Sequence, residues 1–218
     1  MKILKVVVSV AYAVVLIMLF ASLLTSNAYM RLSKGLYASH DDIDYDHDYV
    51  AGQLIDYLNY RHDDLSFGAD ANDNTVLMRD IEIRHMVDVR DVYTMLRLIA
   101  LGCFVFVVGV SVMLYRKNKT AFYDMFKNIF WVPLGFFIFV GTWFLIDFGR
   151  IFTWFHLLFF SNDDWILRSD DVLIRLLPSN FWLVSGSIIL LGTVVMLALT
   201  VILNERFIKP QIKKNTLN

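Results

Sequence analysis

Four apolar stretches of about 20 residues dominate this chain and restrict it to folds that cross a lipid bilayer. A helix rises about 1.5 Å per residue, so about 20 residues cover a hydrocarbon core of roughly 30 Å. Backbone amides inside that core must bond to one another, which favours helices. The sequence therefore predicts an all-α membrane bundle with four transmembrane helices, at Ile3–Leu24, Thr94–Tyr115, Ile129–Phe148 and Trp182–Leu203.

The composition agrees with a membrane protein and argues against several other classes. Of the 218 residues, 57% are hydrophobic, and the formal net charge is only -1. A chain without a basic surplus lacks the field that neutralises nucleic-acid phosphates, so nucleic-acid binding is not expected. The single cysteine, Cys103, excludes an intramolecular disulfide and any Cys-x-x-Cys redox or zinc motif.

The basic residues are unevenly distributed and predict an orientation in the membrane. The N-terminus, residues 116–128 and residues 204–218 together hold ten Lys and Arg but only two acidic residues. Because positively charged segments beside spans stay in the cytoplasm, both termini are predicted to be cytoplasmic, with residues 25–93 and 149–181 outside. The apolar core of Ile3–Leu24 exceeds the roughly 7 to 15 residues of a signal peptide, which favours an uncleaved anchor.

The long outer segment is expected to fold into a small extracellular α+β domain. Apolar residues recur at helical spacing from Val50 to Arg61, with Asp46 and Asp48 before them, which predicts a short amphipathic helix. From Ile81 to Val89 apolar and polar residues alternate, as in a strand. A helix that begins early, near His85, is the alternative, and it makes His85 and Asp88 neighbours on one face.

The shorter outer segment opens with an aromatic run, Ile151 to Phe160, that is too short to span a bilayer. Aromatic rings favour the membrane interface, so this run is expected to lie at the outer interface. A turn-like polar cluster around Asn162 and Asp163 follows it.

Metal sites and covalent nucleophiles are not evident in the sequence. The acidic run His40 to Asp48 fails the EF-hand pattern, because the sixth position from Asp42 is His47 where glycine is required. The five histidines lack paired-ligand spacing, and the chain contains neither Gly-x-Ser-x-Gly nor Ser-x-x-Lys. No metal and no cofactor are predicted.

Two histidines, His85 and His156, occupy unusual places in the outer segments. His156 lies within the aromatic run, and His85 lies where the alternating pattern approaches the second span. Imidazole titrates near neutral pH, so either ring is able to exchange protons with a substrate. From the residues alone, a structural histidine bonded to a nearby backbone or carboxylate group is favoured over a catalytic one at each position.

Two sequence motifs resemble those of a known family. The segments His85-Met86-Val87-Asp88-Val89-Arg90 and Phe155-His156-Leu157-Leu158-Phe159-Phe160 are similar to motifs of the lipoprotein intramolecular transacylases. The likeness continues through Asn162-Asp163, Trp165 and the stretch from Asp171 to Pro178. Arg90 stands where the family pattern has Lys. These transacylases are four-span proteins of the bacterial plasma membrane.

The resemblance implies a reaction on bacterial lipoproteins whose N-terminal cysteine carries a diacylglyceryl group and a free α-amine. The acyl chain at the sn-2 ester would move to that amine and give a lyso-form lipoprotein, at the extracellular face and beside membrane phospholipid. By resemblance, His85 and His156 would be the catalytic residues. Further residues expected to orient these groups, to order the loop or to bind substrate are Asp88, Arg90, Asn162, Asp163, Trp165 and Asp171. Arg150, near the end of the third span, is expected to reach a phospholipid headgroup or a substrate carbonyl, or to serve as an interfacial anchor.

Both histidines have a place in this chemistry. We assign His85 as the base that removes a proton from the amine, with Asp88 or another carboxylate orienting its ring, and His156 as the donor to the oxyanion or leaving oxygen. Exchanging the two roles is equally consistent with the sequence. Two other functions remain open at this point: a phospholipid-dependent N-acyltransferase, and a non-catalytic membrane scaffold or sensor.

Overall fold

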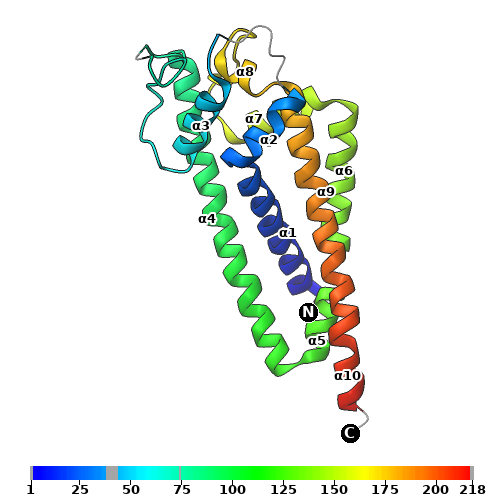
Figure 1. Cartoon of the computed structure of the whole chain (residues 1–218). Helices are drawn as coiled ribbons and strands as arrows, with labels where there is room; N and C mark the ends of the chain where they lie inside the picture. Colours follow the sequence, from blue (N-terminus) through cyan, green and yellow to red (C-terminus); the bar gives the residue numbers. More distant parts are fainter. Residues whose placement is uncertain (1, 38–43, 74, 217–218) are drawn as a thin grey trace. The chain divides into compact units, whose positions relative to one another are not determined.

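The computed structural model describes residues 2–37, 44–73 and 75–216, and helices account for most of them (Figure 1). The predicted helical class is confirmed. The β part of the predicted outer domain is wrong, because none of the described residues forms a strand.

The elements are α1 Lys2–Leu24, α2 Asn27–Tyr37, α3 His47–Leu58, α4 Asp80–Lys117, α5 Lys119–Lys127, α6 Trp131–Ile146, α7 Phe148–Phe159, α8 Val172–Leu176, α9 Ser179–Leu203, the π-helix η2 Asn204–Ile208 and α10 Lys209–Thr216.

The chain divides into two compact units, which are described separately. The first unit comprises Met1–Phe20, Arg97–Ile146 and Ser187–Asn218. The second unit comprises Ala21–Leu96 and Asp147–Gly186. Helices α1, α4 and α9 each contribute residues to both units.

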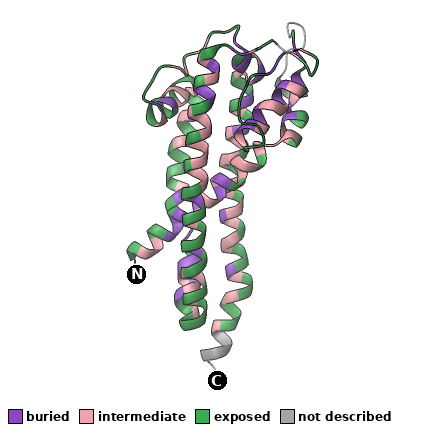
Figure 2. Cartoon of the chain, turned by 90° about the vertical axis from the view of Figure 1, so that its left-hand side faces the viewer, coloured by how far each residue is buried: buried purple, intermediate pink, exposed green. Residues whose placement is uncertain are grey.

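Four segments are long and apolar enough to cross a membrane, as predicted: Lys2–Leu24, Asp80–Lys117, Lys119–Ile146 and Ser179–Ile212. Large apolar side chains such as Leu98, Val105, Phe139 and Leu191 are exposed on them, and Figure 2 shows exposed residues along the long helices. An aqueous surface rarely carries so much apolar area, whereas lipid tails accept it. The protein is therefore a multi-pass membrane protein.

Small residues allow close helix packing in the first unit. A Cβ atom on Gly192 of α9 would lie 2.6 Å from ring carbons of Phe20, at the end of the α1 part of this unit. Only glycine permits that approach, which is typical of helix packing inside membranes. Val8 of α1, Val107 of α4 and Ile129, between α5 and α6, belong to a buried apolar cluster of the same unit.

The amphipathic helix predicted in the long outer segment is confirmed as α3. Its N-cap is Asp46, whose Oδ1 accepts hydrogen bonds from the backbone N–H groups of Asp48 and Tyr49. Asp48 lies in the first turn, where its negative charge interacts favourably with the positive end of the helix dipole. The helix buries Val50, Leu54 and other apolar residues in the core of the second unit.

The alternating segment Ile81–Val89 is helical, so the strand interpretation is wrong and the early-helix alternative is correct. Glu82 accepts the backbone N–H of Arg79 through Oε2, at 2.9 Å, and closes the first turn of α4. Glu82 and Met86 are buried and Val89 packs on the same core, which is helical spacing. Alternation assigned Glu82 and Met86 to the solvent side, but tertiary contacts cover them.

Candidate active site

His85 and His156 lie side by side in the second unit. His85 projects from the first turns of α4 and His156 from α7, and their ring centres are 5.9 Å apart, with 31° between the ring planes. Both residues are buried, at 8% and 7% exposed. The fold therefore brings together the two histidines that the sequence singled out, although 70 residues separate them in the chain.

Aromatic rings surround His156 and exclude water from it. The ring of Phe152, one turn earlier on α7, lies 4.1 Å from the imidazole, centre to centre. Trp165 lies at 4.8 Å and nearly parallel, at 32°, and the rings of Phe155 and Phe160 both lie at 5.5 Å. The aromatic run from Ile151 to Phe159 thus lies in the 12-residue helix α7, with Phe160 as its C-cap, and its rings pack around its own histidine.

The tautomer of His156 follows from one hydrogen bond. Its Nδ1 lies 2.7 Å from the carbonyl oxygen of Phe152. Because a carbonyl oxygen only accepts, Nδ1 must carry the hydrogen, which leaves the lone pair of the neutral ring on Nε2. Burial lowers the pKa of His156 below its usual value of 6.5, although the bond to Phe152 opposes that shift. The ring is therefore neutral at pH 7 and carries a free base at Nε2.

His85 is neutral at pH 7 for a similar reason. It lies nine residues before the apolar stretch that begins at Thr94, outside the membrane-spanning part of α4. Burial, and then the neighbouring His156, lower the pKa of His85 from 6.5 to about 4, although Asp88 and Asp164 act in the opposite direction. Its Nδ1 is buried and has no hydrogen-bond partner within the described residues. Asp88 therefore does not orient the ring through Nδ1.

Two polar contacts attach the loop after α7 to the helix that carries His85. The side-chain amide of Asn162 donates to Oδ2 of Asp88 at 2.8 Å. The guanidinium of Arg84 donates to both carboxylate oxygens of Asp164, at 2.9 and 3.1 Å. Arg84 and Asp88 are one helical turn apart, with His85 between them in the chain, so these contacts fix the loop beside that histidine.

A buried carboxylate joins two helix starts next to the site. Glu82 is 0% exposed. Its Oε2 accepts the backbone N–H of Arg79 at the start of α4, and its Oε1 accepts the backbone N–H of Leu173 at the start of α8, at 2.9 Å. Asp171, the N-cap of α8, accepts a two-pronged hydrogen bond from the guanidinium of Arg79 and the N–H of Arg168. Burial alone would raise the pKa of Asp171, but these donors hold it below its usual value.

Sequence reasoning missed Glu82, Arg79, Arg84 and Asp164. The local signal for Glu82 was present, because an acid three residues after the start of a helix is the second half of a capping box. The partners of Arg79 and Arg84 lie 92 and 80 residues away in the chain, so no local pattern indicates them.

Arg90 packs between tyrosines of the α3 end. Its guanidinium carbon lies 4.0 Å from the ring centre of Tyr57 and 5.0 Å from that of Tyr60. Tyr60, the residue after the C-cap of α3, has a left-handed backbone conformation with φ 58°. Its hydroxyl forms a hydrogen bond with the hydroxyl of Thr94 at 2.8 Å. A bulky side chain is strained at this φ, so neighbouring contacts must hold Tyr60 there.

Two predicted site residues lie apart from these contacts. Arg150 pairs through Nε with Asp147, the N-cap of its own helix α7, at 3.2 Å. The backbone carbonyl of Asp163 accepts the N–H of Ile166 in the loop, and its side chain is exposed.

Only part of the acidic run His40 to Asp48 lies within the described residues. The described part begins at Asp44, and His40 and Asp42 lie outside it. Asp44 pairs with Arg175 at 2.9 Å, Asp46 caps α3 and Asp48 pairs with Lys34 at 3.1 Å. These three acids thus have structural partners. Among the described residues, no group of three or more His, Cys, Asp or Glu is arranged to hold a metal ion.

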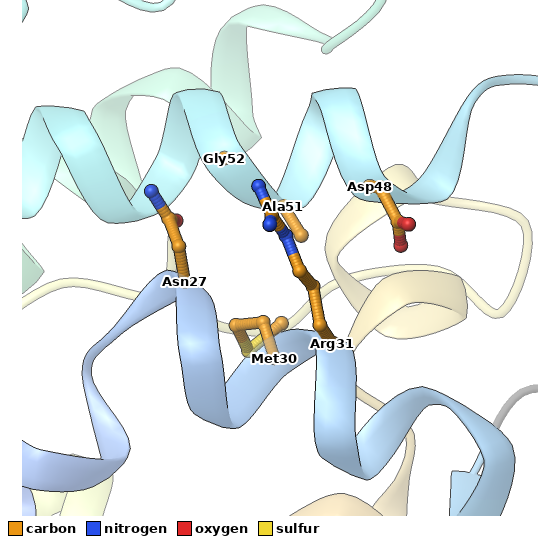
Figure 3. Close-up of a pocket in the computed structure, with 6 residues that line it drawn as sticks. All are labelled: Asn27, Met30, Arg31, Asp48, Ala51 and Gly52. Atoms are coloured by element: carbon orange, nitrogen blue, oxygen red, sulfur yellow. The ribbon is translucent and has the colours of Figure 1, made fainter.

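A small cavity lies between α2 and α3 in the second unit (Figure 3). Its volume is about 40 Å³, and Asn27 and Arg31 of α2 and Asp48 of α3 are among the residues that line it. A water molecule occupies about 30 Å³, so this space does not hold an acyl chain. Neither histidine lines the cavity, so the histidine pair remains the candidate site.

Comparisons with known proteins show which family and which fold this chain shares. The family model described as "Lipoprotein intramolecular transacylase Lit" matches residues 1–182, whereas no curated protein matches the chain. A solved structure of the membrane integral lipoprotein intramolecular transacylase Lit from Bacillus cereus has a TM-score of 0.74 and 21% identity, covering 100% of this chain and 98% of that one.

Two further structures of the Bacillus cereus enzyme, also 21% identical, carry substitutions of a histidine. The H85R form has a TM-score of 0.72, and the match covers 99% of this chain and 93% of that one. The H85A form has a TM-score of 0.70, and the match covers 97% of this chain and 95% of that one. These likenesses establish the shared fold, and the family model spans well over half of the sequence. The chain therefore belongs to the lipoprotein intramolecular transacylase (Lit) family.

Proposed function

We propose that this protein moves the sn-2 ester-linked acyl chain of a diacylglyceryl-modified lipoprotein to the α-amine of its N-terminal cysteine. The product is the lyso-form lipoprotein, N-acylated and with one chain left on glycerol. The observation that carries the proposal is the close pair of buried, neutral imidazoles, 5.9 Å apart. Family membership supports the substrate class.

The reaction does not require a covalent enzyme intermediate. The amine and the ester belong to one molecule, so the enzyme has to fold the substrate until the reacting atoms are about 3 to 3.5 Å apart. A free α-amine has a pKa of about 7.7 to 8.0, so most of it is protonated at neutral pH. The protein must then supply a proton acceptor for the amine and a proton donor for the leaving glycerol oxygen.

We assign His156 as the base. Its Nδ1 hydrogen is engaged by the carbonyl of Phe152, so Nε2 presents a lone pair and is ready to take the amine proton. The aromatic rings around it keep the imidazole neutral at pH 7. This assignment reverses the roles that we first gave to the two histidines.

We assign His85 as the proton donor to the leaving oxygen. Its Nδ1 is buried without a partner in the described part of the chain. A buried acceptor without a partner costs less than a buried donor without one, which favours the neutral tautomer with hydrogen on Nε2. That N–H is available to the glycerol oxygen as the ester bond breaks, and His156 then returns the amine proton to His85.

The remaining residues position these groups. Asn162, Asp88 and Asp171 hold the loop and α8 against the start of α4. The carbonyl of Asp163 closes the turn that contains Trp165, by accepting the N–H of Ile166. Arg90 fixes α3 against α4, since its planar guanidinium stacks on tyrosine rings in a way that Lys cannot.

We propose that both termini are cytoplasmic and that the histidines act at the outer face. The sequence supports this through the basic residues at the N-terminus, in residues 116–128 and in residues 204–218. The acyl chains of the substrate then remain in the outer leaflet beside phospholipid, and the cysteine amine meets the ester at the interface. In this orientation Arg150 extends toward the headgroups.

An isotope experiment tests the proposal. The full-length protein is reconstituted in phospholipid vesicles with a synthetic diacylglyceryl lipopeptide that has a free amine and a labelled sn-2 chain. We expect mass spectrometry to find the labelled chain on the amine, and to find no product with His85→Ala. An unlabelled chain on the amine would rule out the sn-2 ester as the donor, and an unchanged lipopeptide would favour the scaffold function.

A further inference from the structure

Trp165 has a buried indole N–H with no hydrogen-bond partner among the residues that the structure describes. Such groups are rare in folded proteins, because burial removes the hydrogen bond that water would supply. Indole only donates, so the missing partner has to be an acceptor. Trp182, whose ring centre lies 6.4 Å from that of Phe152, does not share the feature: its N–H donates to the carbonyl of Leu177 at 3.0 Å.

The unpaired donor belongs to a ring that stacks directly on the proposed base. The Trp165 and His156 ring centres are 4.8 Å apart, and the planes are inclined by 32°. The loop that carries Trp165 is held on both sides. Before it, Asn162 and Asp164 bind α4; after it, the N–H of Leu167 donates to the carbonyl of Trp165 at 3.1 Å.

We infer that Trp165 is a catalytic residue whose indole N–H binds the carbonyl oxygen of the sn-2 ester and the oxyanion that forms from it. This inference rests on the proposed function. The substrate offers several carbonyl oxygens, but among them only that of the sn-2 ester gains negative charge during the reaction, and the leaving glycerol oxygen already has a donor in His85. A donor fixed in a water-poor aromatic site stabilises developing charge far more than the same donor in water.

The step balances without any further reactant. The amine lone pair forms the N–C bond, the carbonyl π pair moves to oxygen beside the Trp165 N–H, and Nε2 of His156 takes one amine proton. When the carbonyl re-forms, the C–O bond to glycerol breaks and the glycerol oxygen takes a proton from Nε2 of His85. Proton return from His156 to His85 restores both rings, and the products are an amide and an alcohol.

The substitution Trp165→Phe isolates the donor, because it keeps an aromatic ring against His156 and removes only the N–H and the second ring. We expect kcat for the lyso-form product to fall by about 10²- to 10³-fold, the usual cost of losing one oxyanion donor, with little change in KM. Removal of an unsatisfied donor leaves no orphaned partner behind. The lost second ring is then the only source of destabilisation, so the melting temperature should fall less than it does for Trp182→Phe, which loses the same ring and also a hydrogen bond.

Trp182→Phe is the matched control, because it removes an indole N–H that already has a partner. It should lower the melting temperature and leave kcat close to the wild-type value. A wild-type kcat for Trp165→Phe would overturn the assignment of Trp165. The assignment would also fail if Trp165→Phe lowered the melting temperature so far that loss of folded protein accounts for the fall in kcat. If the unsubstituted protein makes no lyso-form product, the proposed function itself fails, so the two failures are distinguishable.

Discussion

The side-chain amide of Asn162 donates a 2.8 Å hydrogen bond to the carboxylate of Asp88, 74 residues earlier in the chain. Through this bond the loop after α7 is attached to α4 three residues beyond His85. The backbone N–H of Asp164 in turn donates to Oδ1 of Asn162, at 3.1 Å, so one amide side chain both shapes the loop and anchors it. We expect this attachment, together with the pair of Arg84 and Asp164, to help fix the positions of the two histidines.

Loss of the Asn162 amide should therefore reduce activity. Asn162→Ala removes the bond to Asp88, and small displacements of reacting groups have large effects on rate, so kcat/KM should fall by about 10-fold or more. Ser161→Ala, at an exposed neighbouring position, is the control and should retain full activity. Formation of the lyso-form from a synthetic lipopeptide measures both; equal rates for Asn162→Ala and the unchanged protein would refute the attachment role.

The pH dependence of kcat/KM should have a single acid limb near neutral pH. The pKa of His85 is lowered from 6.5 to about 4 and that of His156 lies below 6.5, so both rings are mostly neutral between pH 6.5 and 7.5. Only the substrate amine, with a pKa of about 7.7 to 8.0, titrates in that range. The logarithm of the rate should then rise with slope 1 there, and the slope should approach 2 only at lower pH. A slope of 2 between pH 6.5 and 7.5 would show that a histidine titrates near its ordinary pKa.

Glu82 should be one of the most stabilising residues of the second unit. Glu82→Ala leaves the N–H groups of Arg79 and Leu173 without acceptors, at a cost of about 1 to 3 kcal/mol each. Thermal unfolding in detergent measures the loss. Asp80→Asn is the control, since Asp80 is exposed in the same first turn and should contribute less than about 1 kcal/mol. Equal stabilities for the two variants would contradict the role given to Glu82.

The stacking of Arg90 predicts that Lys is a poor replacement. If the planar guanidinium on Tyr57 and Tyr60 is what matters, Arg90→Lys and Arg90→Met should both destabilise the protein, by about 0.5 to 2 kcal/mol. If the charge alone matters, Arg90→Lys should match the unchanged protein and only Arg90→Met should be destabilised. Chemical or thermal unfolding of the three proteins separates these outcomes.

Local sequence patterns were enough to predict α3 and the four apolar helices. Asp46 and the spacing from Val50 onward indicate α3 without any tertiary information. The start of α4 was harder, because Glu82 is buried by a contact with Leu173, 91 residues away, and alternation alone placed it on the solvent side. The histidine pair was indicated by resemblance, whereas periodicity did not distinguish His85 and His156 from structural histidines.

The chemical roles proposed for the site residues could be assigned only from the three-dimensional structure. The carbonyl of Phe152 fixes the tautomer of His156, and the unpaired N–H of Trp165 emerges only when burial and hydrogen bonds are known. Sequence spacing contains neither fact, because a ring's protonated nitrogen is set by its partner in space. For the same reason the roles of the two histidines, left exchangeable by the sequence, were assigned from the geometry.

A crossover experiment tests most directly whether the histidine pair catalyses transfer within one substrate molecule. Two lipopeptides of different peptide mass, one with a heavy sn-2 chain and one with a light chain, are incubated together with the reconstituted protein. We predict only products in which each peptide keeps its own chain, and no products with His156→Gln. Products in which the heavy chain sits on the amine of the light lipopeptide would contradict intramolecular transfer.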